Sequence, residues 1–224
     1  TNVEYIIVNE AGASVYSASK YADEEFPDFS EGERSAVSIA RRLQDPLAEL
    51  VKIDPKSIGV GQYQHDMNQK QLTESLSGVV EKVVNEVGVD LNTASVSLLN
   101  YVSGIGNTTA KNIIEYREEN GSFNSRKELL KVKKLGKKTY EQCAGFIKVN
   151  NPQYPLDNTT IHPESYDATY KLLEKLNYSV DDIGSSSLKL DNVNIDEISK
   201  ELDIGQETLK DIIKELKKPG RDPR

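Results

Sequence analysis

The sequence predicts a mainly α protein with a small α/β part at its N-terminal end. Most of its 224 residues fall into segments whose apolar side chains recur at helical spacing behind a capping residue. Two short runs rich in β-branched residues, 3–8 and 58–63, favour strands, and helical segments lie between them. From residue 92 onward the chain reads as short helices joined by tight turns.

The first 66 residues hold the strand signals. Residues 14–19 are expected to form a second short strand or an extended loop after the turn at 10–13. Ser30 and Glu33 form a capping-box pattern in front of an apolar helix face. Asp45 followed by Pro46 predicts that a further helix starts there. This order of strand, helix and strand indicates an α/β unit with too few strands for a full sheet.

Residues 67–90 are predicted to form one long helix that links two domains. Asp66 is the expected cap, and Gly88 the expected end. The apolar residues at helical spacing are Leu72, Leu76, Val79, Val80, Val83, Val84 and Val87. They span about six turns at 3.6 residues per turn.

Residues 91–150 contain the same pattern twice, at an offset of 30 residues. Each copy has a helix, a tight turn with a glycine, and a second helix. The turns are Ser103-Gly104-Ile105-Gly106 and Lys133-Lys134-Leu135-Gly136. This is the helix-hairpin-helix pattern, in which the aliphatic residue turns inward and the freed backbone N–H groups face outward. A single Gly-Ile-Gly could be an ordinary helical corner, but two copies followed by Lys and Thr favour a shared function.

The chemistry that fits both turns is phosphate binding. Helix N-termini present N–H groups and a positive dipole end to an anion. The residues predicted to contact nucleic-acid phosphates are Gly104, Ile105, Gly106, Thr108, Thr109, Lys111, Lys133, Lys134, Gly136, Lys137, Lys138 and Thr139. Such contacts carry no base information. With about 4–6 phosphates neutralised, log affinity is expected to fall with log salt at a slope of roughly −4 to −5.

The charge distribution supports this location, although the whole chain has a net charge of −8. Residues 92–148 carry ten basic and five acidic side chains, whereas residues 149–224 carry ten basic and fifteen acidic ones. A ligand at the turns senses the local charge because salt screens charges beyond about 8 Å. An ordinary lysine-rich surface is the alternative explanation.

Enzymatic and metal sites are weakly signalled. Glu10 and Asp66 follow the two expected strands, where a two-metal nuclease would hold carboxylates, but a loop residue and a helix cap explain them better. His65 and His162 are too far apart in sequence to indicate a zinc site, and His162 reads as a cap before Pro163. The single cysteine, Cys143, is expected to be packed and unreactive. We therefore predict no catalytic residue, no metal and no cofactor.

Three tyrosines near the turns, Tyr101, Tyr116 and Tyr140, could stack on bases, but their helical spacing favours core positions. The last turn, at 202–208, resembles the first two with acidic residues in place of the lysines. No apolar run approaches the roughly 18 residues of a transmembrane helix, so no membrane contact is expected. A reducing cytoplasm fits the single cysteine.

Four stretches resemble the bacterial Tex family of transcription accessory proteins, which are related to a eukaryotic transcription elongation factor. They are residues 11–17, 41–47, 59–66 and 151–163. The resemblance extends over essentially the whole chain. It implies that residues 1–66 are the C-terminal part of a YqgF, RNase H-like domain and 67–90 a linking helix. It further implies a tandem helix-hairpin-helix domain at 91–150, a second helical domain of that type at 151–220, and a tail at 221–224.

In this family a helical region precedes such a segment and an OB-fold RNA-binding domain follows it, so the chain is expected to be a fragment. The main functional hypothesis is non-catalytic, sequence-tolerant binding of DNA or RNA within a transcription-associated protein. One alternative is a scaffold that docks RNA polymerase or other transcription proteins through its acidic flanks. The other is a metal-dependent nuclease, although the first strand of its active site would lie upstream of Thr1.

Overall fold

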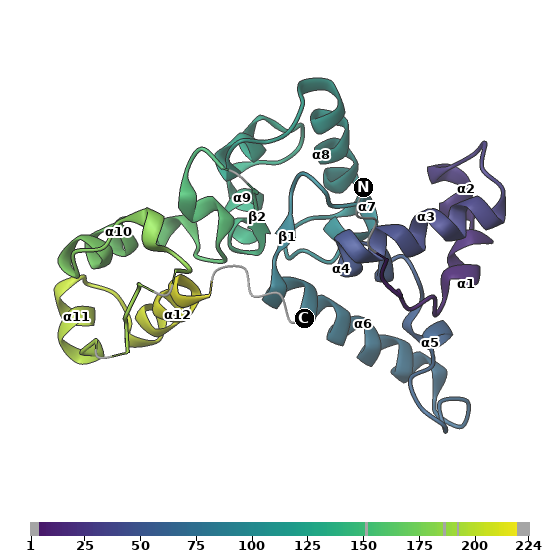
Figure 1. Cartoon of the computed structure of the whole chain (residues 1–224), viewed down its shortest axis with the longest axis horizontal. Coiled ribbons are helices and arrows are strands. Elements are labelled where there is room, and N and C mark those ends of the chain that lie inside the picture. The colour runs from purple at the N-terminus through teal and green to yellow at the C-terminus, as the bar shows by residue number, and fades with distance from the viewer. Residues whose placement is uncertain (1–4, 151, 186, 192, 219–224) are drawn as a thin grey trace. The chain divides into compact units, whose positions relative to one another are not determined.

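The computed structural model describes residues 5–150, 152–185, 187–191 and 193–218. The chain divides into two compact units, residues 1–83 and 84–224. Figure 1 shows that both units are built from helices. Within the described residues, one very short pair of strands lies in the second unit. The prediction of a mainly α chain is confirmed.

From residue 5 onward, where the structure describes it, the first unit contains five short or medium helices and most of a sixth. They are α1 (Ala13–Ser17), α2 (Lys20–Glu25), α3 (Glu31–Gln44), α4 (Pro46–Leu50), α5 (Pro55–Ile58) and α6 (Gln69–Val87), which crosses the division. The Ser30–Glu33 capping box forms as predicted, since Glu33 accepts from the Ser30 N–H at 2.8 Å. Asp45 caps α4 with Pro46 in its first turn.

A small core and a group of buried charges hold this unit together. Tyr16, Ala22 and Ile53 form the apolar core. Beside them the Lys52 ammonium, only 2% exposed, lies 2.7 Å from Glu49 and 3.0 Å from Glu25. Glu25 also accepts from the Tyr16 hydroxyl. These charges are stabilised because each is paired at hydrogen-bonding distance.

The expected strands of the first unit are not found among its described residues. Residues 5–8 are irregular, residues 3 and 4 lie outside the described part, and 14–19 begin within helix α1. At 58–63 the chain leaves α5 at Ile58 and turns, with Gly59 at φ 89°. A strand needs a neighbour to satisfy its backbone, and the described residues of this unit offer none.

Helix α6 (Gln69–Val87) lies within the predicted range 67–90, is shorter at both ends and has a different cap. Asn68 accepts from the N–H groups of Lys70 and Gln71, at 3.1 and 3.2 Å, in place of the predicted Asp66. Gly88 ends the helix at φ 76°, as predicted, and its N–H donates to Val84. No described helix has the length and apolar character that a membrane crossing requires.

The second unit begins with an arrangement of helices around two short strands. In chain order these are β1 (Val89–Asp90), α7 (Val96–Leu99), α8 (Asn107–Asn120), the 3-10 helix η1 (Arg126–Lys131), α9 (Lys137–Cys143), η2 (Ala144–Phe146) and β2 (Ile147–Lys148). The strands pair in parallel, Val89 with Ile147, which ties the two ends of this segment together. Ser95, and not the predicted Asn92 or Thr93, caps α7.

The rest of the second unit has its own apolar core. Its elements are η3 (Pro155–Asn158), η4 (Pro163–Ser165), α10 (Tyr166–Lys175), η5 (Val180–Asp182), α11 (Ile195–Glu201) and α12 (Gln206–Lys217). Figure 1 shows α10, α11 and α12 gathered together, apart from α8 and α9. The side chains of Leu172, Leu209, Ile212 and Leu216 are among those that form the core.

One fully buried arginine, Arg126, joins the two halves of this unit, the first from β1 to β2 and the second from η3 to α12. The Arg126 guanidinium donates to the carbonyls of Ile147 and Ile161, each at 2.6 Å, and of Thr159. It also donates to the Tyr166 hydroxyl at 2.7 Å, and that hydroxyl donates to Asp157. Residues on both sides of the 150–155 segment are therefore held by one side chain.

Candidate nucleic-acid interface

The first hairpin, residues 104–106, has the predicted geometry. Gly104 has φ +82°, a conformation that favours glycine, and Ile105 is 5% exposed. The Ile105 N–H donates to Val102 at 3.0 Å, which closes the turn. Gly106 is extended and immediately precedes α8. The inward position of Ile105 leaves the following backbone to face outward.

The N-terminal end of α8 is open to a ligand. Its cap residue, Gly106, has no side chain to cover the first turn, and that turn contains no acidic residue. Among the described residues, no hydrogen bond uses the N–H groups of Asn107, Thr108 or Thr109. Free N–H groups at a helix start are the donors that bind phosphate in other proteins.

The second hairpin, residues 134–136, repeats this geometry. Lys134 takes the place of Gly104, with φ +62°, and Leu135 is 4% exposed. The Leu135 N–H donates to Val132 at 3.2 Å, and Gly136 precedes α9 without a side-chain cap. The 30-residue repeat predicted from sequence is thus a repeat of backbone conformation.

The two hairpins are brought together by reciprocal contacts. The Asn112 side chain of α8 donates to the carbonyl of Lys133, at 2.8 Å, in the second turn. Gln142 of α9, 30 residues after Asn112, lies against Gly104 in the first turn, where an added Cβ would be 2.8 Å from the Gln142 Cβ. Each turn therefore packs on the second helix of the other copy.

The predicted cationic residues are exposed around these turns. Lys111, Lys133, Lys134, Lys137 and Lys138 are all exposed, and Thr108 is exposed while Thr109 and Thr139 are half-buried. Lys137 has an ion pair with Glu141 at 4.0 Å, in which both side chains are largely exposed. A pair of this kind is worth little and leaves the ammonium available.

The structure reveals two more hairpins, one of which the sequence did not indicate. In the described chain, the non-glycine residues with positive φ are Lys134, Asn177 and Asp203. Asn177 and Asp203 begin a third hairpin (residues 177–179) and a fourth hairpin (residues 203–205). The fourth coincides with the acidic turn noted at 202–208. The third, Asn-Tyr-Ser, contains no glycine and gave no signal.

These later hairpins carry carboxylates where the second hairpin carries lysines. The Asp182 carboxylate accepts from both the N–H and the hydroxyl of Ser179, at 2.8 and 3.1 Å, which holds the pKa of Asp182 below its usual value. Glu207 lies in the first turn of α12. The Asp182 carboxylate thus occupies the N-terminal end of η5, and the Glu207 carboxylate, bonded to Lys210 at 2.6 Å, adds negative charge beside the fourth hairpin.

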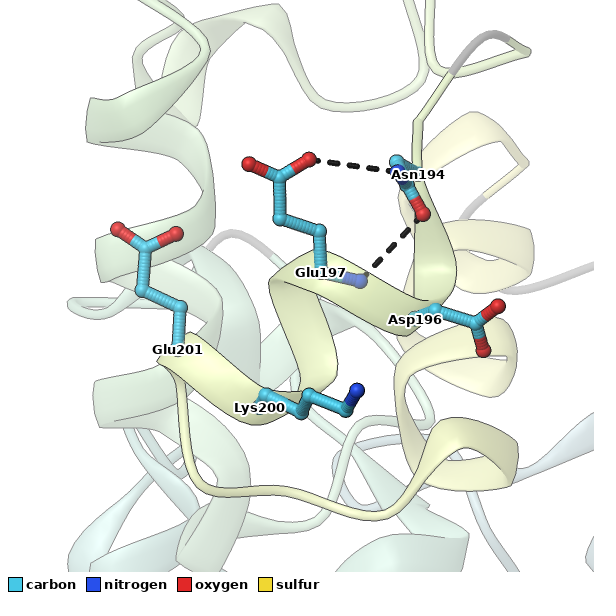
Figure 2. Close-up of a pocket in the computed structure, with 5 residues that line it drawn as sticks. All are labelled: Asn194, Asp196, Glu197, Lys200 and Glu201. Atoms are coloured by element: carbon cyan, nitrogen blue, oxygen red, sulfur yellow. Dashed lines mark hydrogen bonds between the residues drawn. The ribbon is translucent and has the colours of Figure 1, made fainter.

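An open pocket lies at α11, in the same half of the unit. Figure 2 shows its lining residues, Asn194, Asp196, Glu197, Lys200 and Glu201, with Asn194 hydrogen-bonded to Glu197. Three of the five carry a carboxylate. The pocket is therefore unsuited to a nucleic-acid phosphate.

The remaining candidates are packing or capping residues, or are exposed and ungrouped. Cys143 is fully buried, and burial raises the pKa of its thiol to about 12, which suits packing. His162 caps η4 as predicted, and Tyr116 stacks on the buried Phe123. Glu10 and Asp66 are exposed. In the part of the chain that the structure describes, no three His, Cys, Asp or Glu side chains are grouped to hold a metal.

Comparison with known families agrees with this architecture. The helix-hairpin-helix motif family matches residues 84–148, and a family described as HHH domain matches 154–224. The Tex protein YqgF-like domain matches residues 1–44. Relatives named Tex match along the whole chain: the transcriptional accessory protein Tex of Neisseria gonorrhoeae is 54% identical over 224 residues, which are 100% of this chain and 30% of that protein.

The chain belongs to the Tex family. The uncharacterized protein YdcI of Bacillus subtilis (strain 168) is 61% identical, over 99% of this chain and 31% of YdcI. The human S1 RNA-binding domain-containing protein 1 is 40% identical, over 97% of this chain and 27% of that protein. This Tex-family chain thus spans about 30% of the length of the curated relatives it matches.

Proposed function

We propose that this chain binds nucleic acid through phosphate contacts at the first and second hairpins, without sequence preference and without catalysis of its own. The observation that carries the proposal is the pair of reciprocally packed hairpins, with open N–H groups on α8 and exposed lysines on both helices. The match of residues 84–148 to the helix-hairpin-helix motif family supports it. Phosphate contacts alone would fix the position of the protein but read no sequence.

The test is charge reversal with a matched control. Changing Lys111, Lys133, Lys134, Lys137 and Lys138 to Glu should abolish binding to mixed-sequence DNA and RNA, measured by fluorescence anisotropy, without unfolding the chain. The control changes five exposed lysines of the other half to Glu, namely Lys171, Lys189, Lys200, Lys214 and Lys218. It alters the net charge equally and should retain binding. Equal loss in both variants would refute the proposal.

A second proposed function, docking of transcription proteins, is favoured by the acidic third and fourth hairpins. The relative in Neisseria gonorrhoeae is named a transcriptional accessory protein, and a basic surface on RNA polymerase or another such protein would complement these carboxylates. Capture of purified polymerase after nuclease treatment, lost when Asp181, Asp182, Asp203 and Glu207 become Asn or Gln, would support it.

We further propose the domain division at 1–66, 67–90, 91–150, 151–220 and 221–224, with the first segment as part of an RNase H-like domain. A nuclease function is tested by Mg²⁺- or Mn²⁺-dependent cleavage and by its loss in Glu10→Gln and Asp66→Asn. We expect no cleavage, because both side chains are exposed and neither belongs to a metal-binding group in the described chain.

A further inference from the structure

The first and second hairpins have the same backbone conformation, but the first is largely uncharged and the second is cationic. At the 30-residue offset, four exposed positions are uncharged in the first copy and cationic in the second. The pairs are Ser103 and Lys133, Gly104 and Lys134, Asn107 and Lys137, and Thr108 and Lys138. The only described cation of the first copy near its turn is Lys111, one helical turn further along α8, and its counterpart is Glu141. The positive charge is therefore concentrated at the second of the two hairpins.

The packing of the first turn excludes a side chain at Gly104. A Cβ on Gly104 would collide with Gln142, so this position of the first turn must remain without a side chain. The counterpart of Gln142 is Asn112, which bonds to the Lys133 carbonyl, and the Lys134 side chain of the second turn is exposed. The first turn consequently presents bare backbone, and the second presents an ammonium group.

Helices α8 and α9, which follow the two turns, differ in length and in the charge at their N-terminal ends. Helix α8 has 14 residues, so its dipole and free N–H groups act on an anion at the first hairpin. Helix α9 has only seven residues, and four lysines flank its start. Hydrogen bonds from N–H and hydroxyl groups displace no counterion, whereas each lysine that neutralises a phosphate does.

We infer that the two hairpins divide the binding between them, an inference that rests on the proposed function. Lys133, Lys134, Lys137 and Lys138 supply most of the salt-dependent part of the affinity. Thr108, Thr109 and the N–H groups of α8 supply a part that salt leaves nearly unchanged. The Tex-family site is thus asymmetric, with a cationic contact beside a hydrogen-bonding contact.

The experiment measures affinity for a mixed-sequence duplex of about 20 base pairs across a series of salt concentrations. Changing the four lysines to Gln should reduce the magnitude of the salt slope by about 3.6, at roughly 0.9 per phosphate. Changing Thr108 and Thr109 to Val should weaken binding about tenfold with the slope unchanged. The control, Lys171, Lys189, Lys200 and Lys214 to Gln, should change neither quantity.

A gain of charge completes the test. Asn107→Lys with Thr108→Lys gives the first copy the residues of the second and should increase the slope by about 2. Equal slope changes in the lysine and threonine variants, or no increase in the gain variant, would overturn the division of roles while binding itself remains. Unaltered binding in every variant would instead show that the proposed function is wrong.

Discussion

Gly104 lies so close to Gln142 that a Cβ at Gly104 would be 2.8 Å from the Gln142 Cβ. The same glycine has φ +82°, where an L side chain is strained. The positive φ belongs to the first turn itself, and the close approach to Gln142 belongs to its contact with α9. The geometry of the interface therefore depends on the absence of a single methyl group.

Gly104→Ala is expected to destabilise the second unit by about 2 kcal/mol, the sum of a strained φ and a steric displacement. Urea unfolding followed by circular dichroism measures it. Gly106→Ala is the control, because Gly106 has φ −97° and nothing within 4 Å of an added Cβ. It should cost less than half as much. Equal costs would mean that the contact with Gln142 is unimportant.

Lys134→Gly is expected to separate stability from binding. Lys134 has φ +62°, so glycine should stabilise the fold by up to about 1 kcal/mol. The same change removes one cation and should weaken nucleic-acid binding several-fold. Thermal unfolding and anisotropy on the same sample give both values. Lys133→Gly, one residue earlier, should weaken binding without the gain in stability, and a gain of stability there would contradict the argument.

Local signals predicted the first and second hairpins and most caps correctly, because these depend on residues close in sequence. Ser30, Asp45 and His162 act as caps where their neighbours predicted it. The strand signals at 3–8 and 58–63 failed, because a strand depends on a partner strand and not on its own composition. The third hairpin was missed because Asn177 adopts positive φ without a glycine to indicate it.

Long-range polar contacts were the other feature that sequence could not predict. Nothing near Arg126 indicated that it would be fully buried and bonded to carbonyls 21 to 35 residues away. A charged residue in a lysine-rich segment reads as surface. Only the folded path of residues 147–161 supplies the acceptors that make its burial favourable.

Arg126→Met is expected to cost about 3–5 kcal/mol, because it leaves the buried carbonyl oxygens of Ile147, Ile161 and Thr159 without their charged donor. Arg126→Lys should recover little, since an ammonium cannot reach the same set of acceptors. Urea unfolding measures both. The control is Lys127→Met, at an exposed position, which should change stability by less than about 0.5 kcal/mol. Full stability in Arg126→Met would show that the two halves of the unit hold together without this residue.

Glu25 should make the first unit sensitive to acid. Burial by itself would raise the pKa of Glu25, but hydrogen bonds from Tyr16 and Lys52 and the charge of Lys52 outweigh it and leave the pKa below the ordinary 4.5. A carboxyl with a depressed pKa stabilises the fold above its unfolded pKa. That stabilisation is lost as the pH falls through the folded pKa. Unfolding should therefore become easier below about pH 4.5.

Glu25→Gln tests this pH dependence directly. At pH 7 it should cost about 1–2 kcal/mol, at the low end for hydrogen bonds to a charge because the Glu25 side chain is 23% exposed. At about pH 3 the cost should shrink toward zero, since the wild-type carboxyl is then losing its charge as well. Glu24→Gln, on an adjacent residue that is 68% exposed, is the control and should show no such trend. A Glu25→Gln cost that stays constant from pH 7 to pH 3 would mean that Lys52 and Tyr16 do not hold Glu25 in its charged form.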